Sequence, residues 1–133
     1  MIHAWRQLKF AEIEEWRMEV AQLRGHNRKI TAKFNSNDYM PLLLEARKHA
    51  SEGAKFDQVR GVYIPPGVAV DAHTDGYEAF IYMLHDHPSR LCVEEQSIGT
   101  VEGTMVKVPL GCLHSVSLNE GDPRLTLAVM FKI

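Results

Sequence analysis

The sequence predicts a mainly β domain with N-terminal helices, whose short strands form a double-stranded β-helix of the jelly-roll type. Two observations support this prediction. Apolar residues follow a helical period up to Gly53, whereas β-forming residues dominate afterwards. Turn residues then interrupt the chain at short intervals, as they do in sandwiches and barrels. We expect the 133 residues to form one domain, in which a helical segment at residues 1–53 packs on a barrel at residues 54–133.

Two helices are expected in the N-terminal segment. The first lies between Trp5 and Leu23, where apolar residues recur at steps of three and four and so share one helix face. Gly25 is a natural stop for this helix. The second runs from about 38 to 52, with candidate N-caps at 36–38 and a proline in its first turn. Both helices are expected to cover one face of a sheet.

Short β-forming runs follow Gly53 and are separated by glycine, proline and asparagine. Such a series of strands is typical of a jelly roll. The predicted strands span 58–64, 68–73, 78–84, 90–95, 98–101, 104–108, 113–118 and 124–132.

Composition narrows the function classes. The net charge of −2 and the absence of runs of like charge give no electrostatic footprint for nucleic acid. No stretch is apolar enough for a membrane span, and the first residues lack the apolar region of a secretory signal. Two unclustered cysteines indicate buried thiols rather than a disulfide framework. We therefore expect a cytoplasmic protein with no nucleic-acid or membrane partner. The oligomeric state is left open, a homodimer included.

Three residues form a candidate metal site. His73 and Asp75 are two positions apart, so on an extended strand their side chains leave the same face. His114, on a late strand, is the best candidate for the third ligand. Two imidazoles and one carboxylate make up the facial triad of non-haem Fe(II) oxygenases, which leaves coordination positions open. A chance His-x-Asp is the alternative. The similar segment His85-Asp86-His87 is expected in a solvated turn.

An anion anchor is predicted on the last strand. Arg124 begins this strand, and Thr126 shares its face. A guanidinium binds a carboxylate through two parallel hydrogen bonds, and a neighbouring hydroxyl can add another. An arginine that faces into a barrel needs such a partner, because an unpaired buried charge is costly. A surface arginine is the alternative interpretation.

The order His73-x-Asp75, His114, Arg124-x-Thr126 resembles the Fe(II)/2-oxoglutarate-dependent oxygenases, particularly the aspartyl/prolyl hydroxylase-like group. The resemblance covers roughly residues 56–132. It implies Fe(II) on the triad and 2-oxoglutarate as cosubstrate, with Arg124 from the opposite sheet binding the distal carboxylate. It also implies hydroxylation of an amino acid, peptide or small metabolite, with no catalytic side chain beyond the metal ligands. Tyr82 is a further candidate contact to the cosubstrate, with core packing as its alternative.

A second resemblance is to the cupins, which share the barrel. Gly103, Pro109, Gly111 and His114 reproduce the spacing of the second cupin motif. This resemblance implies a metal-binding protein or metalloenzyme that does not use 2-oxoglutarate, in which Glu78 would be a fourth ligand. Cupins usually carry histidine at the position of Asp75 and lack the Arg-x-Thr pair, so the oxygenase is favoured. A non-catalytic barrel that binds a ligand or partner protein is the third hypothesis.

Overall fold

The computed structural model describes residues 2–133, which form ten strands and two α-helices. The strands are β1 (His3–Trp5), β2 (Ile30–Phe34), β3 (Lys55–Ile64), β4 (Val70–His73), β5 (Glu78–Met83), β6 (His87–Val93), β7 (Gln96–Thr100), β8 (Met105–Val108), β9 (His114–Val116) and β10 (Arg124–Lys132). The helices are α1 (Ile13–Ala21) and α2 (Met40–His49), and a 3-10 turn, Ser36–Tyr39, precedes α2.

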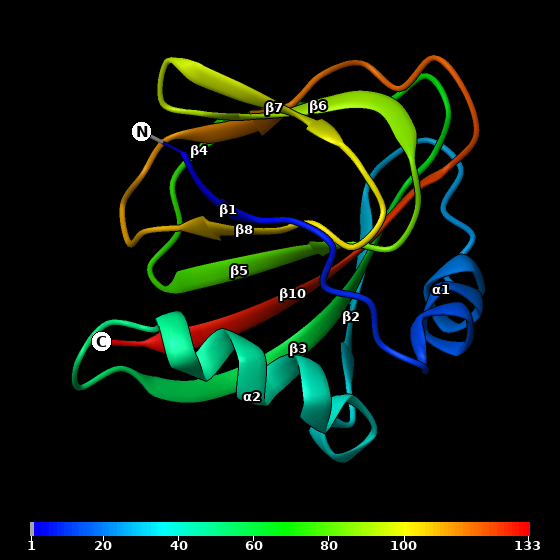
Figure 1. The fold of residues 1–133 in the computed structure, drawn as a ribbon. Helices are drawn as coiled ribbons and strands as arrows, with labels where there is room; N and C mark the ends of the chain where they lie inside the picture. Colours follow the sequence, from blue (N-terminus) through cyan, green and yellow to red (C-terminus); the bar gives the residue numbers. More distant parts are fainter. Residues whose placement is uncertain (1) are drawn as a thin grey trace.

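The strands form two antiparallel sheets that face one another (Figure 1). The larger sheet has the order β1-β8-β5-β10-β3-β2, and the smaller has the order β4-β9-β6-β7. β4 and β9 are paired although they are far apart in the sequence, and so are β3 and β10. The prediction of a mainly β, jelly-roll fold is confirmed.

Both helices lie on the outer face of the larger sheet (Figure 1). Trp16 and Val20 are the buried residues of α1, at the spacing of one helix face. In α2, Pro41 occupies the first turn, and basic residues in the last turn complement the helix dipole. The helices and the sheet enclose the main apolar core, which includes Phe80 on β5 and Phe131 on β10.

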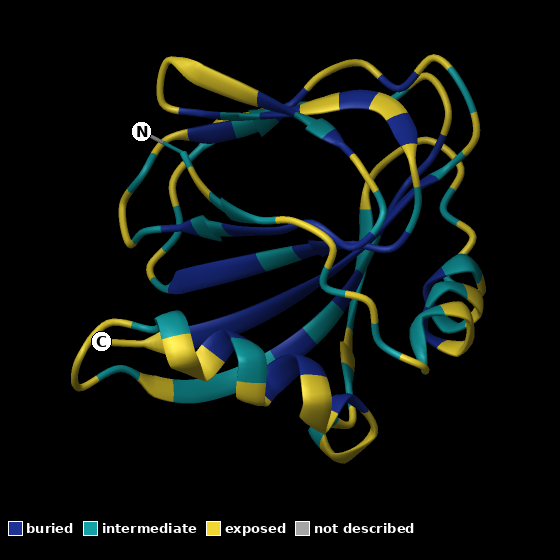
Figure 2. Cartoon of the chain, viewed as in Figure 1, coloured by how far each residue is buried: buried dark blue, intermediate teal, exposed yellow. Residues whose placement is uncertain are grey.

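β10 is the central strand that separates this core from the barrel interior. Its residues from Arg124 to Phe131 are all buried, and Figure 2 shows the strand in dark blue. Side chains alternate along it: Leu125, Leu127, Val129 and Phe131 belong to the helix-side core. Arg124, Thr126, Ala128 and Met130 line the space between the sheets. A strand buried on both faces reads as a near-continuous apolar run, so its inward polar residues stand out.

The N-terminal region differs from the helical segment predicted for residues 1–53. His3–Trp5 pairs with β8, and Ile30–Phe34 pairs with β3, so this region adds an edge strand on each side of the larger sheet. The first helix begins at Ile13 rather than near Trp5. These short edge strands form through pairing with distant segments, which local periodicity does not report. The predicted strand 124–132 coincides with β10, and the other seven overlap β3–β9.

Within the described residues, neither helix has the length and apolar character that crossing a membrane requires.

Candidate metal centre

The candidate ligands come together where β4 and β9 pair in the smaller sheet. His73 lies directly opposite His114 in the antiparallel register, so both side chains leave the same face. Asp75 follows β4 by two residues. A register shift between Val70 and His73 marks an irregularity in β4 just before the site. His73 and Asp75 therefore both lie beside His114, although β4 ends at His73 and Asp75 stands beyond it.

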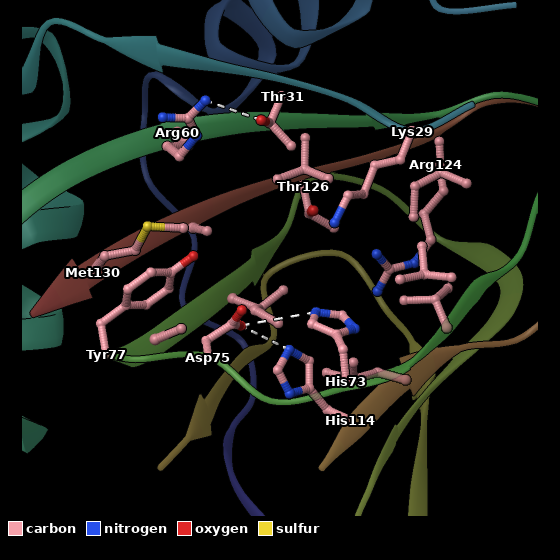
Figure 3. A pocket seen from close by; sticks show the side chains of 18 residues that line it. Lys29, Thr31, Arg60, His73, Asp75, Tyr77, His114, Arg124, Thr126 and Met130 are labelled. Atoms are coloured by element: carbon pink, nitrogen blue, oxygen red, sulfur yellow. Dashed lines mark hydrogen bonds and ion pairs between the residues drawn. The ribbon is translucent and has the colours of Figure 1, made fainter. Parts of the chain in front are cut away.

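The three side chains converge on one point (Figure 3). Asp75 Oδ2 lies 3.1 Å from His114 Nε2 and 3.8 Å from His73 Nε2. The two imidazole rings have centroids 4.2 Å apart. One ligand atom from each residue lies within 4.8 Å of the others, close enough to hold a single ion. His114 is buried, whereas His73 and Asp75 are partly exposed, so the centre opens to solvent on their side.

Backbone carbonyls fix which nitrogen of each imidazole faces the centre. His73 Nδ1 lies 2.8 Å from the Asp71 carbonyl oxygen, and His114 Nδ1 lies 2.9 Å from that of Cys112. A carbonyl only accepts, so both Nδ1 atoms are the protonated donors. In the neutral rings, the Nε2 lone pairs then point at the Asp75 carboxylate. Two lone pairs and an anion that face one another are a ligand set that suits a divalent metal.

The ligands stand at the wall of a cavity of about 210 Å³ between the two sheets. Most of the wall is apolar: Val62, Ile64, Val70, Ala79, Ile81, Leu91, Val116, Ala128 and Met130. The polar or charged lining residues, apart from the three ligands, are Lys29, Thr31, Arg60, Tyr77, Arg124 and Thr126. An apolar pocket with a few convergent polar groups is the usual form of a small-molecule site.

Arg124 is buried at one end of this cavity, with a relative exposure of 2%. Its Nε donates to Thr100 Oγ1 at 3.4 Å, whereas Nη2 has no hydrogen-bond partner among residues 2–133. Burial lowers the pKa of the guanidinium to about 10, so it stays charged at neutral pH. Thr126, the next inward residue of β10, lines the cavity beside it. The Arg124 guanidinium is thus a buried, charged donor with an unused N–H group that could bind an anion.

Sequence reasoning missed the cationic residues at the rest of the wall. Arg60 lies on β3 among the inward residues Val62 and Ile64, where a charge is unusual for a barrel interior. That alternation was a signal available in the sequence. Lys29 and Thr31 gave no such signal, because β2 was not predicted. Burial and the carboxylate of Asp75 raise the pKa of Tyr77, which also lines the cavity.

Two expected site residues lie on the wrong face of the sheet. The Tyr82 hydroxyl donates to the Leu8 carbonyl within the helix-side core, so Tyr82 does not reach the cavity as a cosubstrate contact. Glu78 shares that face of β5, and its carboxylate accepts from the Ser51 backbone N–H at 2.8 Å and lies 3.7 Å from Lys107 Nζ. Glu78 is therefore not placed to be a fourth metal ligand. Alternation along β5 is the reason, since Ala79 and Ile81 are the residues that face inward.

The two histidines of the segment 85–87 are more buried than the predicted solvated turn would leave them. His87 begins β6 and is buried, and its Nε2 donates to the Asp122 carbonyl at 2.6 Å. His85 Nε2 accepts from the backbone N–H of Leu125 at 3.0 Å. Both histidines have structural partners away from the metal centre.

Comparisons with known proteins match this fold but no sequence family. No protein-family model matches the chain, and no curated protein matches it either. Among solved structures, HygX from Streptomyces hygroscopicus with nickel and 2-oxoglutarate bound is 11% identical, with a TM-score of 0.78, over 98% of this chain and 82% of that chain. The viral collagen prolyl hydroxylase vCPH from Paramecium bursaria Chlorella virus-1, in its 2-oxoglutarate complex, is 11% identical, with a TM-score of 0.73, over 99% and 96%.

A cupin superfamily protein from Desulfitobacterium hafniense is 10% identical, with a TM-score of 0.57, over 86% of this chain and 87% of that chain. At these identities the likeness shows the fold alone. The chain has the double-stranded β-helix fold seen in Fe(II)/2-oxoglutarate oxygenases and in cupins, which confirms the structural side of both resemblances.

Proposed function

We propose that this protein is an Fe(II)- and 2-oxoglutarate-dependent oxygenase that hydroxylates a small molecule or a peptide. One observation carries the proposal. The cavity that contains the convergent His73, Asp75 and His114 side chains also contains the buried guanidinium of Arg124, which lacks an acidic partner among residues 2–133. A metal-ligand set and an anion anchor in one cavity are what a chelating dicarboxylate cosubstrate requires.

The three ligands would hold the metal from one side. Two neutral imidazoles and one carboxylate leave a divalent ion with residual positive charge and open coordination positions. The carbonyls of Asp71 and Cys112 keep the histidine rings in the tautomer that binds metal. When bound, iron and 2-oxoglutarate supply the oxidation, in which O₂ and the decarboxylation of 2-oxoglutarate to succinate insert oxygen into the substrate.

Arg124 and Thr126 would hold the distal carboxylate of 2-oxoglutarate. The guanidinium has an unused Nη2 donor, and the threonine hydroxyl lies on the same face of β10. Because the anchor belongs to the larger sheet and the metal ligands to the smaller one, the cosubstrate would bridge the two sheets. The apolar walls around it would keep water from the reacting atoms. A metal-only cupin gives no account of this buried charge.

Anaerobic titration tests the proposal. Fe(II) with 2-oxoglutarate is expected to give a visible charge-transfer band, which is lost in His73→Ala and retained in His26→Ala, a control at an exposed histidine. Arg124→Met should raise the Kd for 2-oxoglutarate about 100-fold, since a desolvated charge pair loses one partner, while Fe(II) affinity stays the same. Succinate release in air is the second measurement.

Two results would contradict the proposal. One is stoichiometric metal binding with no spectral response to 2-oxoglutarate and no succinate, which would favour the cupin-type alternative. The other is normal 2-oxoglutarate binding by Arg124→Met, which would show that the anchor is elsewhere.

A further inference from the structure

The cavity contains a second arginine, away from Arg124. In the β3–β10 register, Arg60 lies opposite Ala128, whereas Arg124 lies opposite Ile64. Ala128 is four positions after Arg124 on β10, which corresponds to about 13 Å along the strand. Figure 3 shows the two guanidiniums on opposite sides of the view, with the metal ligands below and between them. A cosubstrate held by Arg124 and the metal therefore leaves Arg60 available.

The Arg60 guanidinium is oriented by neutral groups. Its Nη1 donates to Gln58 Oε1 at 2.9 Å, and its Nη2 donates to Thr31 Oγ1 at 3.0 Å. Within the described residues, Arg60 forms no ion pair, and the carboxylate of Asp57 is 3.4 Å from Lys132 Nζ instead. A guanidinium has five N–H donors, so three remain for a ligand. A held, half-buried arginine with spare donors is typical of carboxylate recognition.

The charges of the cavity also favour an anionic ligand at Arg60. Apart from the two histidines, the charged side chains that line the cavity are three cations and one anion. They are Lys29, Arg60, Arg124 and Asp75. A divalent metal and the 2-oxoglutarate dianion would cancel one another. The cavity would still keep an excess of positive charge, and that excess favours an anionic second ligand.

We propose that Arg60, positioned by Thr31, binds a carboxylate of the substrate, so that the substrate is a small organic acid such as a free amino acid. Tyr77 and Met130 add an aromatic and an apolar contact at the same end of the cavity (Figure 3). A cavity of about 210 Å³ is on the scale of small molecules or the carboxyl end of a peptide and excludes a folded partner. That the bound acid is a substrate rests on the proposed oxygenase function, whereas the existence of a carboxylate subsite at Arg60 does not.

Calorimetric titration of the metal-free protein, from which the chelator has been removed by dialysis, tests the subsite in the absence of 2-oxoglutarate. The probes are L-amino acids and short peptides, each as the free acid and as its C-terminal amide, so that the two sources of a carboxylate are separated. The variants are Arg60→Met, Arg60→Lys and Arg124→Met, with Arg6→Met as the control for loss of an exposed arginine. Circular dichroism establishes that each variant is folded.

We expect a free acid to bind and its amide to bind at least about 10-fold more weakly, because hydrogen bonds to a charged group are lost. Arg60→Met should weaken the acid about 10- to 100-fold and Arg60→Lys less, whereas Arg124→Met should weaken it less than Arg60→Met and Arg6→Met should leave its affinity unchanged. The proposal is overturned if acids and amides bind equally, if no acid binds, or if Arg124→Met and not Arg60→Met removes binding. If Arg60→Met does not fold, the affinity of Arg60→Lys and the comparison of acids with amides test the proposal instead. Because metal and cosubstrate are absent, this result is independent of the charge-transfer experiment.

Discussion

The two faces of the larger sheet are built from the same strands but differ in how their polar groups are paired. On the helix side, Trp16 Nε1 donates to the Asp38 carbonyl at 3.1 Å, and the Tyr82 hydroxyl donates to the Leu8 carbonyl. Glu78 accepts from the backbone and hydroxyl of Ser51. On the cavity side, the Arg124 guanidinium keeps an unused donor, and Arg60 binds only neutral groups.

This difference separates a structural face from a functional one. A buried polar atom without a partner costs free energy, so proteins retain few of them. Among residues 2–133 there are two such side-chain atoms, Thr104 Oγ1 and Arg124 Nη2. Arg124 Nη2 is the charged one, and its residue is the one of the two that lines the cavity. The side that leaves charge unpaired is therefore the side on which we propose that ligands bind.

The largest expected effect comes from two neighbours on β5 that face opposite sides. Phe80 is fully buried in the helix-side core, whereas Ile81 faces the cavity and is half-buried. Phe80→Ala should lower the free energy of unfolding by about 3–5 kcal/mol. Ile81→Ala should lower it by about 1 kcal/mol, because its site is already open. Urea unfolding of the two variants measures the difference, and equal losses would contradict the division between the faces.

A smaller effect of opposite sign is expected for Arg124→Met. Burial lowers the pKa of Arg124 to about 10, which means that folding opposes its charge. Methionine fills similar space without the charge, so the ligand-free protein should become more stable by about 1–3 kcal/mol. Urea unfolding at pH 7 in EDTA checks this, with Arg6→Met as the control. A destabilised variant would show that the guanidinium has a structural role in the ligand-free protein.

The sequence was sufficient to predict what depends on short-range pattern. The strand at 124–132 has the predicted bounds, and the two-residue spacing of His73 and Asp75 predicted that their side chains would lie close together, as they do, although Asp75 stands beyond β4. The meeting of His73 with His114 depends on a register between distant strands, which no local pattern contains; the family resemblance supplied it.

The failures have the same physical cause. Period alone shows that Tyr82 and Ile81 face opposite sides of β5, but it does not show which side is the cavity. Two short edge strands, β1 and β2, form by pairing with β8 and β3, and they were not predicted. The cavity-lining Lys29 and Thr31 lie just before and within β2, so the sequence alone did not place them in the site.

The smallest effect concerns a histidine on the helix side, in contrast to those of the metal centre. His85 Nε2 accepts from the Leu125 N–H, and burial lowers the pKa of His85 to about 4, with His87 and nearby arginines acting in the same direction. Because the folded pKa lies below the unfolded value of 6.5, the unfolded state takes up a proton first as the pH falls. The stability is complete above pH 6.5 and is lost progressively toward pH 4.

We expect this loss to reach about 1–2 kcal/mol, because the ring is still partly solvated and its charge is screened. His85→Gln removes the titration and keeps an oxygen near the position of Nε2 that can accept from Leu125. Urea unfolding in EDTA at pH 7 and pH 5 should therefore show a smaller acid loss for His85→Gln than for the original protein. His26→Gln, at an exposed position, should leave the loss unchanged. If His85→Gln loses as much stability as the original protein, His85 is not the source of the acid sensitivity.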